Sequence, residues 1–152
     1  MWVVAEPARS RLTSAEEDSA MAERKRRITV VNDDTTFLEL MRDLLQTEEG
    51  YDVNYCKEAD RAYQFVKETQ PDLVILDIRV GGEESGWLIL NLLTLDPATR
   101  PIPVLVCSAA IDSLQDHEAL LQQYDCEVLP KPFDLAALLE KVQVALAKYR
   151  RG

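Results

Sequence analysis

The stretch Pro71-Asp72-Leu73-Val74-Ile75-Leu76-Asp77 decides the fold. Four consecutive apolar residues run directly into an acidic residue, and a loop-like segment follows. Short apolar runs of this kind are typical of a strand that is buried on both faces, as in a parallel sheet. Open sheets of that kind keep their chemistry at the carboxyl ends of their strands. We therefore expect Asp77 to be the central carboxylate of a functional site.

Strand-like and helix-like segments alternate on both sides of this stretch. Alternation of this kind predicts a parallel sheet with helices on both faces. With right-handed crossovers, the expected fold is α/β, a doubly wound three-layer sandwich whose five strands take the flavodoxin-like order 2-1-3-4-5. The expected strands are 28–31, 51–56, 73–76, 101–108 and 126–130, and the expected helices are one ending near residue 48, 58–69, 86–96, 112–123 and 133–149.

Length and composition favour one ordinary globular domain. The chain has 152 residues, of which 47% are hydrophobic and 29% charged. We expect residues 1–26, which show little periodicity, to be a disordered tail, and residues 27–150 to form the domain. No run approaches the roughly 18 apolar residues needed to span a membrane, and no signal peptide opens the chain, so a cytoplasmic location is expected.

The charge of the chain also limits its partners. Residues 1–26 hold as many basic as acidic residues, so the rest of the chain carries the net charge of −10. A domain this acidic is unsuited to direct nucleic-acid binding, which depends on Lys and Arg contacts to phosphates. The three cysteines, Cys56, Cys107 and Cys126, lie in or beside apolar runs without metal-binding spacing, and we interpret them as buried small hydrophobes.

Polar residues follow four of the five expected strands. Because these strand ends meet at one edge of the sheet, their side chains are expected to lie close together. Two carboxylates held near 4 Å repel each other by about 1 to 4 kcal/mol, so the pair needs a hard cation, and oxygen ligands with open positions suit Mg²⁺. The residues concerned are Asn32, Asp33 and Asp34 after the first strand, Asp77, Ser108, and Lys131 after the fifth.

A metal, a carboxylate, a hydroxyl and a lysine around one aspartate are typical of phosphoryl transfer. In that chemistry Asp77 is the nucleophile, Mg²⁺ and Lys131 neutralise the transferring group, and the Ser108 hydroxyl contacts a phosphoryl oxygen. Asp34 has a separate expected role, as the N-cap of the helix that follows it.

The chain from about residue 27 to 150 resembles a response-regulator receiver domain of two-component signalling. Each matching motif is short, but all four occur in order at the ends of the expected strands. They are Val31-Asn32-Asp33-Asp34, Leu76-Asp77, Cys107-Ser108-Ala109 and Pro130-Lys131-Pro132-Phe133.

The resemblance implies a role for each of these positions. Asp77 would be phosphorylated by a histidine kinase or phosphotransfer protein, and Asp33 and the carbonyl of Arg79 would ligate Mg²⁺ together with Asp77. Ser108 would be the switch hydroxyl, and Lys131 would pair with the phosphate and precede a cis bond to Pro132. Such a domain is a signalling module rather than an enzyme, apart from Mg²⁺-dependent self-phosphorylation and slow self-dephosphorylation.

Four departures from the family pattern affect this site. Asn32 replaces the first of two acids, so it is at most an outer-shell metal residue and the Mg²⁺ requirement is expected to be higher. Val128 stands where many members carry an aromatic switch residue. The loop after Asp77 lacks the usual Met-Pro and is one residue longer, with Gly86 nine residues on. Arg79 is bulky and is expected to shield an acyl phosphate from water.

The output is expected to pass through a partner, because no effector domain follows residue 152. Phosphorylation adds a charge of about −1.5 to −2 and would bias the surface formed by helix 112–123, strand 126–130 and helix 133–149. That surface would bind an unknown downstream effector, or a second copy to form a homodimer. His117 is expected to be a solvated helix residue and not a phosphodonor.

Two other functions compete with this interpretation. The first is a degenerate receiver that binds partners without phosphorylation, which Asn32 and Val128 favour. The second is a phosphatase that passes through an aspartyl phosphate. Such enzymes need an acid two residues after the nucleophile, and that position is Arg79, so this reading is strongly disfavoured.

Overall fold

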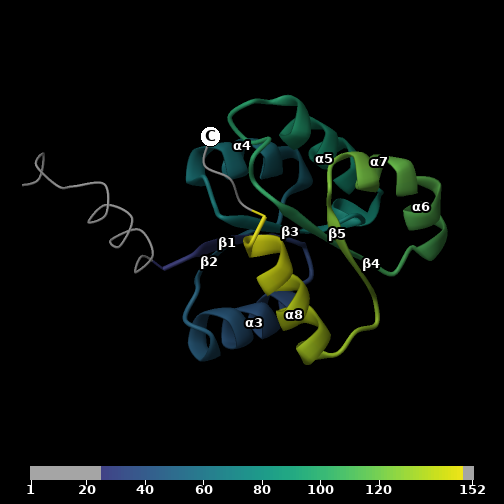
Figure 1. Ribbon diagram of the computed structural model, residues 1–152. Coiled ribbons are helices and arrows are strands. Elements are labelled where there is room, and N and C mark those ends of the chain that lie inside the picture. The colour runs from purple at the N-terminus through teal and green to yellow at the C-terminus, as the bar shows by residue number, and fades with distance from the viewer. Residues whose placement is uncertain (1–24, 149–152) are drawn as a thin grey trace, which may run out of the picture.

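The computed structural model describes residues 25–148 of the chain (Figure 1). The predicted tail over residues 1–26 lies almost wholly outside this range, and so do residues 149–152. The tail and the domain boundaries therefore stay predictions. No helix of the described part is long and apolar enough to cross a membrane.

Five parallel strands form one sheet in the order β2-β1-β3-β4-β5, which confirms the predicted fold (Figure 1). The central strand is β3, the stretch that opens at Leu73. The strands are β1 (Arg27–Val31), β2 (Asp52–Cys56), β3 (Leu73–Asp77), β4 (Val104–Ser108) and β5 (Glu127–Pro130).

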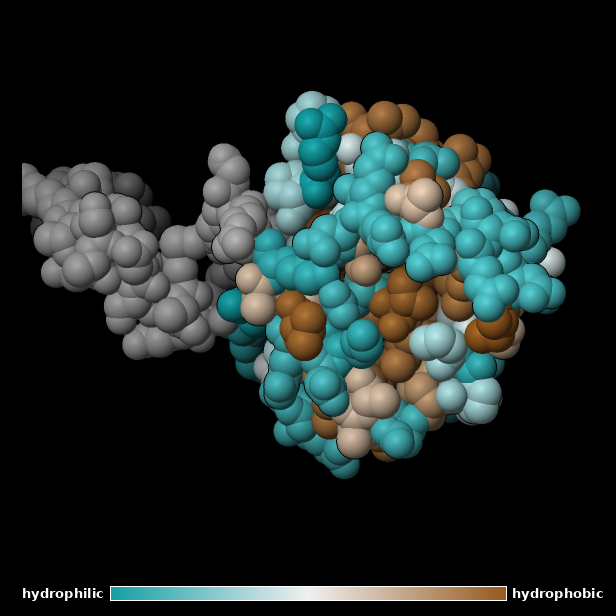
Figure 2. All heavy atoms as spheres, turned by 45° about the vertical axis from the view of Figure 1, so that its right-hand side comes forward, coloured by the Kyte–Doolittle hydropathy of each residue, from teal (hydrophilic) through white to brown (hydrophobic). Residues whose placement is uncertain are grey.

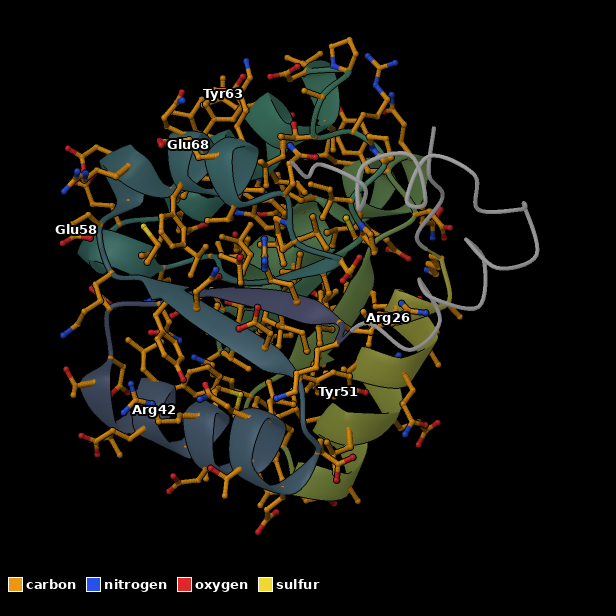
Figure 3. All side chains as sticks on the ribbon, turned by 90° about the vertical axis from the view of Figure 1, so that its left-hand side faces the viewer. Arg26, Arg42, Tyr51, Glu58, Tyr63 and Glu68 are labelled. Atoms are coloured by element: carbon orange, nitrogen blue, oxygen red, sulfur yellow. The ribbon has the colours of Figure 1, made fainter. Side chains whose placement is uncertain are left out.

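Helices cover both faces of this sheet. The layer drawn above the sheet in Figure 1 holds α4, α5, α6 and α7, and the layer below it holds α3 and α8. Figure 3 shows the same two layers from the β2 edge, with Glu58, Tyr63 and Glu68 on the upper side and Arg42 and Tyr51 on the lower. The helices are α3 (Thr35–Met41), the π-helix η1 (Arg42–Glu48), α4 (Ala59–Thr69), the 3-10 turn η2 (Val80–Gly82), α5 (Gly86–Leu95), α6 (Ile111–Asp116), α7 (Glu118–Gln123) and α8 (Leu135–Leu146).

The strand β3 is buried on both faces, as its apolar run predicts. Val74 and Leu76 pack into the core beneath α4 and α5, whereas Leu73 and Ile75 pack into the core beneath α3 and α8. All four are at most 1% exposed. Burying each such side chain stabilises the fold by about 1.5 to 3 kcal/mol before entropy is considered. This anchoring fixes the position of Asp77 at the end of the strand.

Three predicted helices differ from the structure. The helix expected over 112–123 is two helices, α6 and α7, which meet at His117 with φ −109° and ψ 17°. The first helix continues from α3 into the π-helix η1. The last helix begins at Leu135 and not near 133, because the Asp134 side chain accepts a hydrogen bond from Ala137 N and caps it.

The cysteines behave as small hydrophobes. Cys56 and Cys107 are buried, Cys126 is half-buried, and all three are free thiols. Burial raises the pKa of the Cys107 and Cys126 thiols to about 12. Thiols with such a pKa are almost fully protonated at neutral pH and are poor nucleophiles.

Candidate functional site

The carboxyl ends of β1, β3, β4 and β5 meet at one edge of the sheet. Asp77 is the last residue of β3 and pairs in register with Cys107 of β4. Ser108, the last residue of β4, pairs with Pro130 of β5. Parallel pairing therefore brings together strand ends that are up to about a hundred residues apart in the chain, as the sequence predicted.

Asp77 and Lys131 form an ion pair at this edge. Lys131 Nζ lies 3.6 Å from Asp77 Oδ2, and the two side chains are only 28% and 13% exposed. The other carboxylate oxygen, Oδ1, accepts a hydrogen bond of 3.2 Å from the backbone N–H of Arg79. Lys131 is held in place by its backbone N–H, which donates to the Ser108 carbonyl at 2.9 Å, and the following bond to Pro132 is cis.

Phe37 of α3 also contacts Lys131. Lys131 Nζ lies 5.0 Å from the centre of the Phe37 ring, a cation–π distance. The Phe37 ring meets the Phe133 ring edge to face, with centroids 6.4 Å apart. Helix α3 thus contacts the lysine through the Phe37 ring. Neither periodicity nor local spacing in the sequence relates Phe37 to Lys131.

The three polar residues after β1, Asn32, Asp33 and Asp34, have different roles. Asp33 is exposed, and its Oδ2 accepts a hydrogen bond of 3.0 Å from Gly81 N, in the loop after Asp77. Asp34 caps α3 by accepting from the N–H groups of Thr36 and Phe37, which confirms the N-cap prediction.

Asn32 is buried, at 1% exposure, and acts as a turn residue. Its Oδ1 accepts a hydrogen bond of 2.9 Å from Asp34 N. Its Nδ2 has no hydrogen-bond partner among the described residues. An amide nitrogen cannot ligate a cation, and a neutral amide oxygen that already accepts one hydrogen bond attracts a cation less than a carboxylate would, so Asn32 adds little to a metal site.

The remaining donors fit Mg²⁺. Asp33 and Asp77 provide carboxylate oxygens, and the Arg79 carbonyl accepts one hydrogen bond, of 3.0 Å from Gly82 N, which leaves it a second lone pair. This is an oxygen-only set with few protein ligands, the kind that Mg²⁺ prefers because it keeps several waters. Within residues 25–148, no group of three or more His, Cys, Asp or Glu side chains is placed so that it could hold a metal ion.

Ser108 is fully buried, at 0% exposure. Its Oγ accepts a hydrogen bond of 3.0 Å from Ala110 N, so it braces the turn into α6. The strand register sets it one residue beyond the Cys107 that pairs with Asp77. The hydroxyl therefore links the turn that starts α6 to the edge of the sheet where Asp77 lies.

A polar cleft of about 480 Å³ opens beside this edge, between the loop after Asp77 and α6. Arg79 and Glu84 line it from the loop, and Ser113 and His117 line it from α6. The Ser113 hydroxyl donates to Glu84 Oε1, and this bond lowers the pKa of the Glu84 carboxyl. This hydrogen bond links the loop after Asp77 to α6. The shielding role expected of Arg79 stays a prediction.

His117 is not the solvated helix residue that the sequence suggested. Its ring stacks on the Trp87 ring with centroids 3.8 Å apart and planes 10° apart. Its Nδ1 lies 2.8 Å from the Ser113 carbonyl, which can only accept, so Nδ1 carries the proton. The stack lies at the residue where α6 ends and α7 begins. Trp87 itself is buried in the core, at 7% exposure.

Residues 28–143 match the family model of the response regulator receiver domain. The chain belongs to this family, whose members are generally signalling modules and not enzymes. Phosphorylation on an aspartate and Mg²⁺ in the active site are general features of the family, and its members interact with histidine kinases or phosphotransfer proteins. The family match covers most of the chain.

Curated relatives include proteins of two sizes. The chain is 30% identical to the DNA-binding dual master transcriptional regulator RpaA of Synechocystis, over 82% of this chain and 51% of that protein. It is 27% identical to the polar-differentiation response regulator DivK of Brucella anthropi, over 76% of this chain and 92% of that protein. The chain therefore spans about half the length of RpaA and most of the length of DivK.

Solved structures share the fold. A response regulator from Chloroflexus aurantiacus superposes with a TM-score of 0.69 at 25% identity, covering 82% of this chain and 99% of that chain. The receiver domain of a sensor histidine kinase from Pseudomonas aeruginosa superposes with a TM-score of 0.68 at 20% identity, covering 82% and 99%. That crystal structure has a magnesium ion coordinated in its active-site cleft. At 20% identity the likeness shows the fold alone.

Proposed function

We propose that this protein accepts a phosphoryl group on Asp77 from a histidine kinase or a phosphotransfer protein. The observation that carries the proposal is the half-buried Asp77–Lys131 pair at the end of β3, with Asp33 on the neighbouring strand end. The lysine charge near the carboxylate suits a group that becomes more negative when it is phosphorylated.

The chemistry assigns one role to each side chain. A carboxylate oxygen of Asp77 attacks the phosphorus of the donor phosphohistidine and forms a new P–O bond. The P–N bond of the donor breaks at the same time, and its electron pair leaves with the histidine ring nitrogen. Lys131 neutralises one phosphoryl oxygen, and the Ser108 hydroxyl turns toward another. Asp33, Asp77 and the Arg79 carbonyl would hold Mg²⁺, which neutralises phosphoryl charge when it is bound.

The switch would run from Ser108 into α6. Because the Ser108 Oγ accepts from Ala110 N, turning the hydroxyl toward a phosphoryl group would release the turn that begins α6. The surface of α6, α7, β5 and α8 would change with it. An apolar groove of about 390 Å³ on this surface, lined by Leu114, Leu121 and Val128 among others, is the proposed docking site for a downstream protein partner.

Several finer expectations belong to this proposal. The partner at the input is a kinase or phosphotransfer protein, and the acidic charge of the chain argues against direct nucleic-acid contact. Action as a stand-alone receiver and a cytoplasmic location are further parts of the proposal. A homodimer through α6, α7, β5 and α8 stays a prediction. Self-phosphorylation from a small phosphodonor and slow self-dephosphorylation are part of the same proposal.

Intact mass spectrometry tests the phosphoacceptor directly. The full chain is incubated with acetyl phosphate, with and without Mg²⁺, and a single phosphoryl adduct is expected only with the metal. Asp77→Asn should abolish the adduct, whereas Asp34→Asn, which alters only the N-cap of α3, should keep it. An adduct that persists in Asp77→Asn would place the acceptor elsewhere.

The alternative function is a receiver that binds its partner without phosphorylation. The buried Asn32 amide favours it, because it replaces a carboxylate that would attract Mg²⁺. Under this alternative, no adduct would form with any donor at any Mg²⁺ concentration. Partner binding would then be unchanged in Asp77→Asn.

A further inference from the structure

Helix α5 presents a row of exposed leucines. Leu88, Leu92 and Leu95 are 63%, 38% and 66% exposed, and their spacing of four and three residues puts them on one side of the helix. The upper edge of Figure 2, on the side where Figure 1 draws α4 and α5, carries hydrophobic side chains. We call Leu88, Leu92 and Leu95 the α5 ridge.

A shallow groove runs beside the α5 ridge. It has a volume of about 330 Å³ and lies between α4 and α5. Ala59 and Tyr63 line it from α4, and Leu88 and Leu92 line it from α5. A ridge next to a groove of similar apolar character can pack against a copy of itself, ridge into groove.

Helix α5 carries no charged residue over its ten positions. A chain with a net charge of −10 repels its own copies wherever acidic faces would meet. The α5 helices of two copies can therefore meet without placing charged residues of their own opposite each other. This favours a second copy of the chain as the occupant.

Two charges of opposite sign flank the α5 ridge at its two ends. Asp60 lines the groove beside Leu88. The Arg100 guanidinium lies next to Leu95, since its Nη2 donates to the Leu95 carbonyl at 3.3 Å. Within the described part of the chain, neither Asp60 nor Arg100 forms an ion pair. Each charge is therefore available to a charge on another molecule.

We propose that the α5 ridge is a homodimer interface in which two α5 helices pack antiparallel. A two-fold axis near Leu92 places Leu88 of one copy against Leu95 of the other, twice. The same axis brings Asp60 of one copy toward Arg100 of the other. The arrangement is self-complementary in both shape and charge, and it does not depend on phosphorylation.

This interface lies apart from the surface proposed for the downstream partner. That surface is formed by α6, α7, β5 and α8, whereas the ridge belongs to α5 and its groove to α4 and α5. A dimer through α5 would therefore leave both copies free to bind a partner.

Sedimentation equilibrium of the unphosphorylated full chain tests the proposal. Wild type is expected to show a concentration-dependent monomer–dimer equilibrium. Leu88→Glu and Leu95→Lys, each measured alone, should weaken the homodimer about tenfold or more, because each replaces a leucine–leucine contact by a charge that faces a buried leucine. Both positions are exposed in the monomer, so the folded state should tolerate them, and circular dichroism and thermal unfolding verify this.

Mixing the two variants distinguishes the antiparallel arrangement from other contacts. In a mixed dimer, the Glu introduced at 88 faces the Lys introduced at 95, and the other end keeps its Leu–Leu contact. The mixture should therefore associate more tightly than either variant alone. A wild type that stays monomeric at all concentrations overturns the proposal, as does a mixture no tighter than its components.

A matched control lies on the other surface. Ile111, on α6, is 44% exposed, and Ile111→Lys should leave the wild-type association unchanged. Loss of the dimer in Ile111→Lys, with Leu88→Glu unaffected, would assign self-association to the α6, α7, β5 and α8 surface and overturn the α5 proposal.

Discussion

The ammonium group of Lys131 lies over the ring of Phe37, 5.0 Å from its centre, while the same group is 3.6 Å from Asp77 Oδ2. The lysine therefore contacts an anion and an aromatic ring at the same time. Both contacts limit where the side chain can move. Phe37, on α3, is thus a positioning residue for the proposed phosphate-pairing lysine.

Replacing Phe37 by Leu should slow phosphorylation of Asp77 by acetyl phosphate about two- to fivefold. The expected size corresponds to a cation–π contribution of about 0.5 to 1 kcal/mol at a partly exposed site. Phe37→Tyr keeps the aromatic face and should restore the wild-type rate. Single-turnover rates measured by intact mass provide the readout. Equal rates for the Leu variant and wild type, with both folded, would show that the ring does not position Lys131.

Asn32→Asp should tighten Mg²⁺ binding. The substitution restores a carboxylate next to Asp33, and an added charge near 4 Å from the ion contributes about 1 to 4 kcal/mol, depending on the effective dielectric. At least a fivefold lower Kd is expected by isothermal titration calorimetry. Gln143→Glu, an exposed position on α8, adds the same charge far from the site and should leave the Kd unchanged. Equal Kd values for Asn32→Asp and wild type would remove Asn32 from the metal site.

Gly86→Ala should destabilise the domain by about 1 to 3 kcal/mol, as overpacking does in other cores. A Cβ on Gly86 would lie 2.4 Å from the Ile78 Cα and 2.9 Å from the Ile78 carbonyl oxygen. Both are backbone atoms, so the loop after Asp77 must shift. Urea unfolding measures the change, and Ser85→Ala is the control because Ser85 makes no cap hydrogen bond. A midpoint unchanged by Gly86→Ala would contradict the close approach.

The Asp96 carboxyl should titrate at unusually low pH. Tyr63 donates a hydrogen bond to it, and with the Ala98 N–H and Lys67 this lowers its pKa from 3.8 to about 2. The pKa of the Asp96 carboxyl is thus lower in the folded chain than in the unfolded chain, so the ionised Asp96 stabilises the fold. This stabilisation is complete above pH 3.8 and is lost as the pH falls toward about 2. In Tyr63→Phe the largest cause is removed, so the pKa should rise toward 3.8.

Carbon-13 NMR titration of the Asp96 side-chain carboxyl in wild type and Tyr63→Phe checks this expectation. Tyr51→Phe, on the opposite layer of the sheet (Figure 3), is the matched control and should leave the Asp96 titration where it is. Identical Asp96 titrations in wild type and Tyr63→Phe would mean that the tyrosine hydroxyl does not stabilise the carboxylate.

The sequence by itself determined the sheet and the residues at its edge. Apolar runs of four residues must be buried on both faces, and their alternation with helical periodicity leaves few topologies besides the observed order. Asp77 and Ser108 could be proposed because each directly follows such a run, and Lys131 because it stands in a Pro-Lys-Pro motif at the end of the last strand. Asp34 was predictable as an N-cap because it stands just before the first helical turn, and this capping is a local interaction.

Only the tertiary structure decided contacts between segments that are distant in the chain. The Phe37–Lys131 contact joins two elements that neither periodicity nor local spacing relates. The Trp87–His117 stack also joins α5 to the residue at which the predicted helix divides into α6 and α7. The burial of Asn32 and the exposure of the α5 ridge likewise depend on which surfaces neighbouring elements cover, and that is a property of the assembled fold.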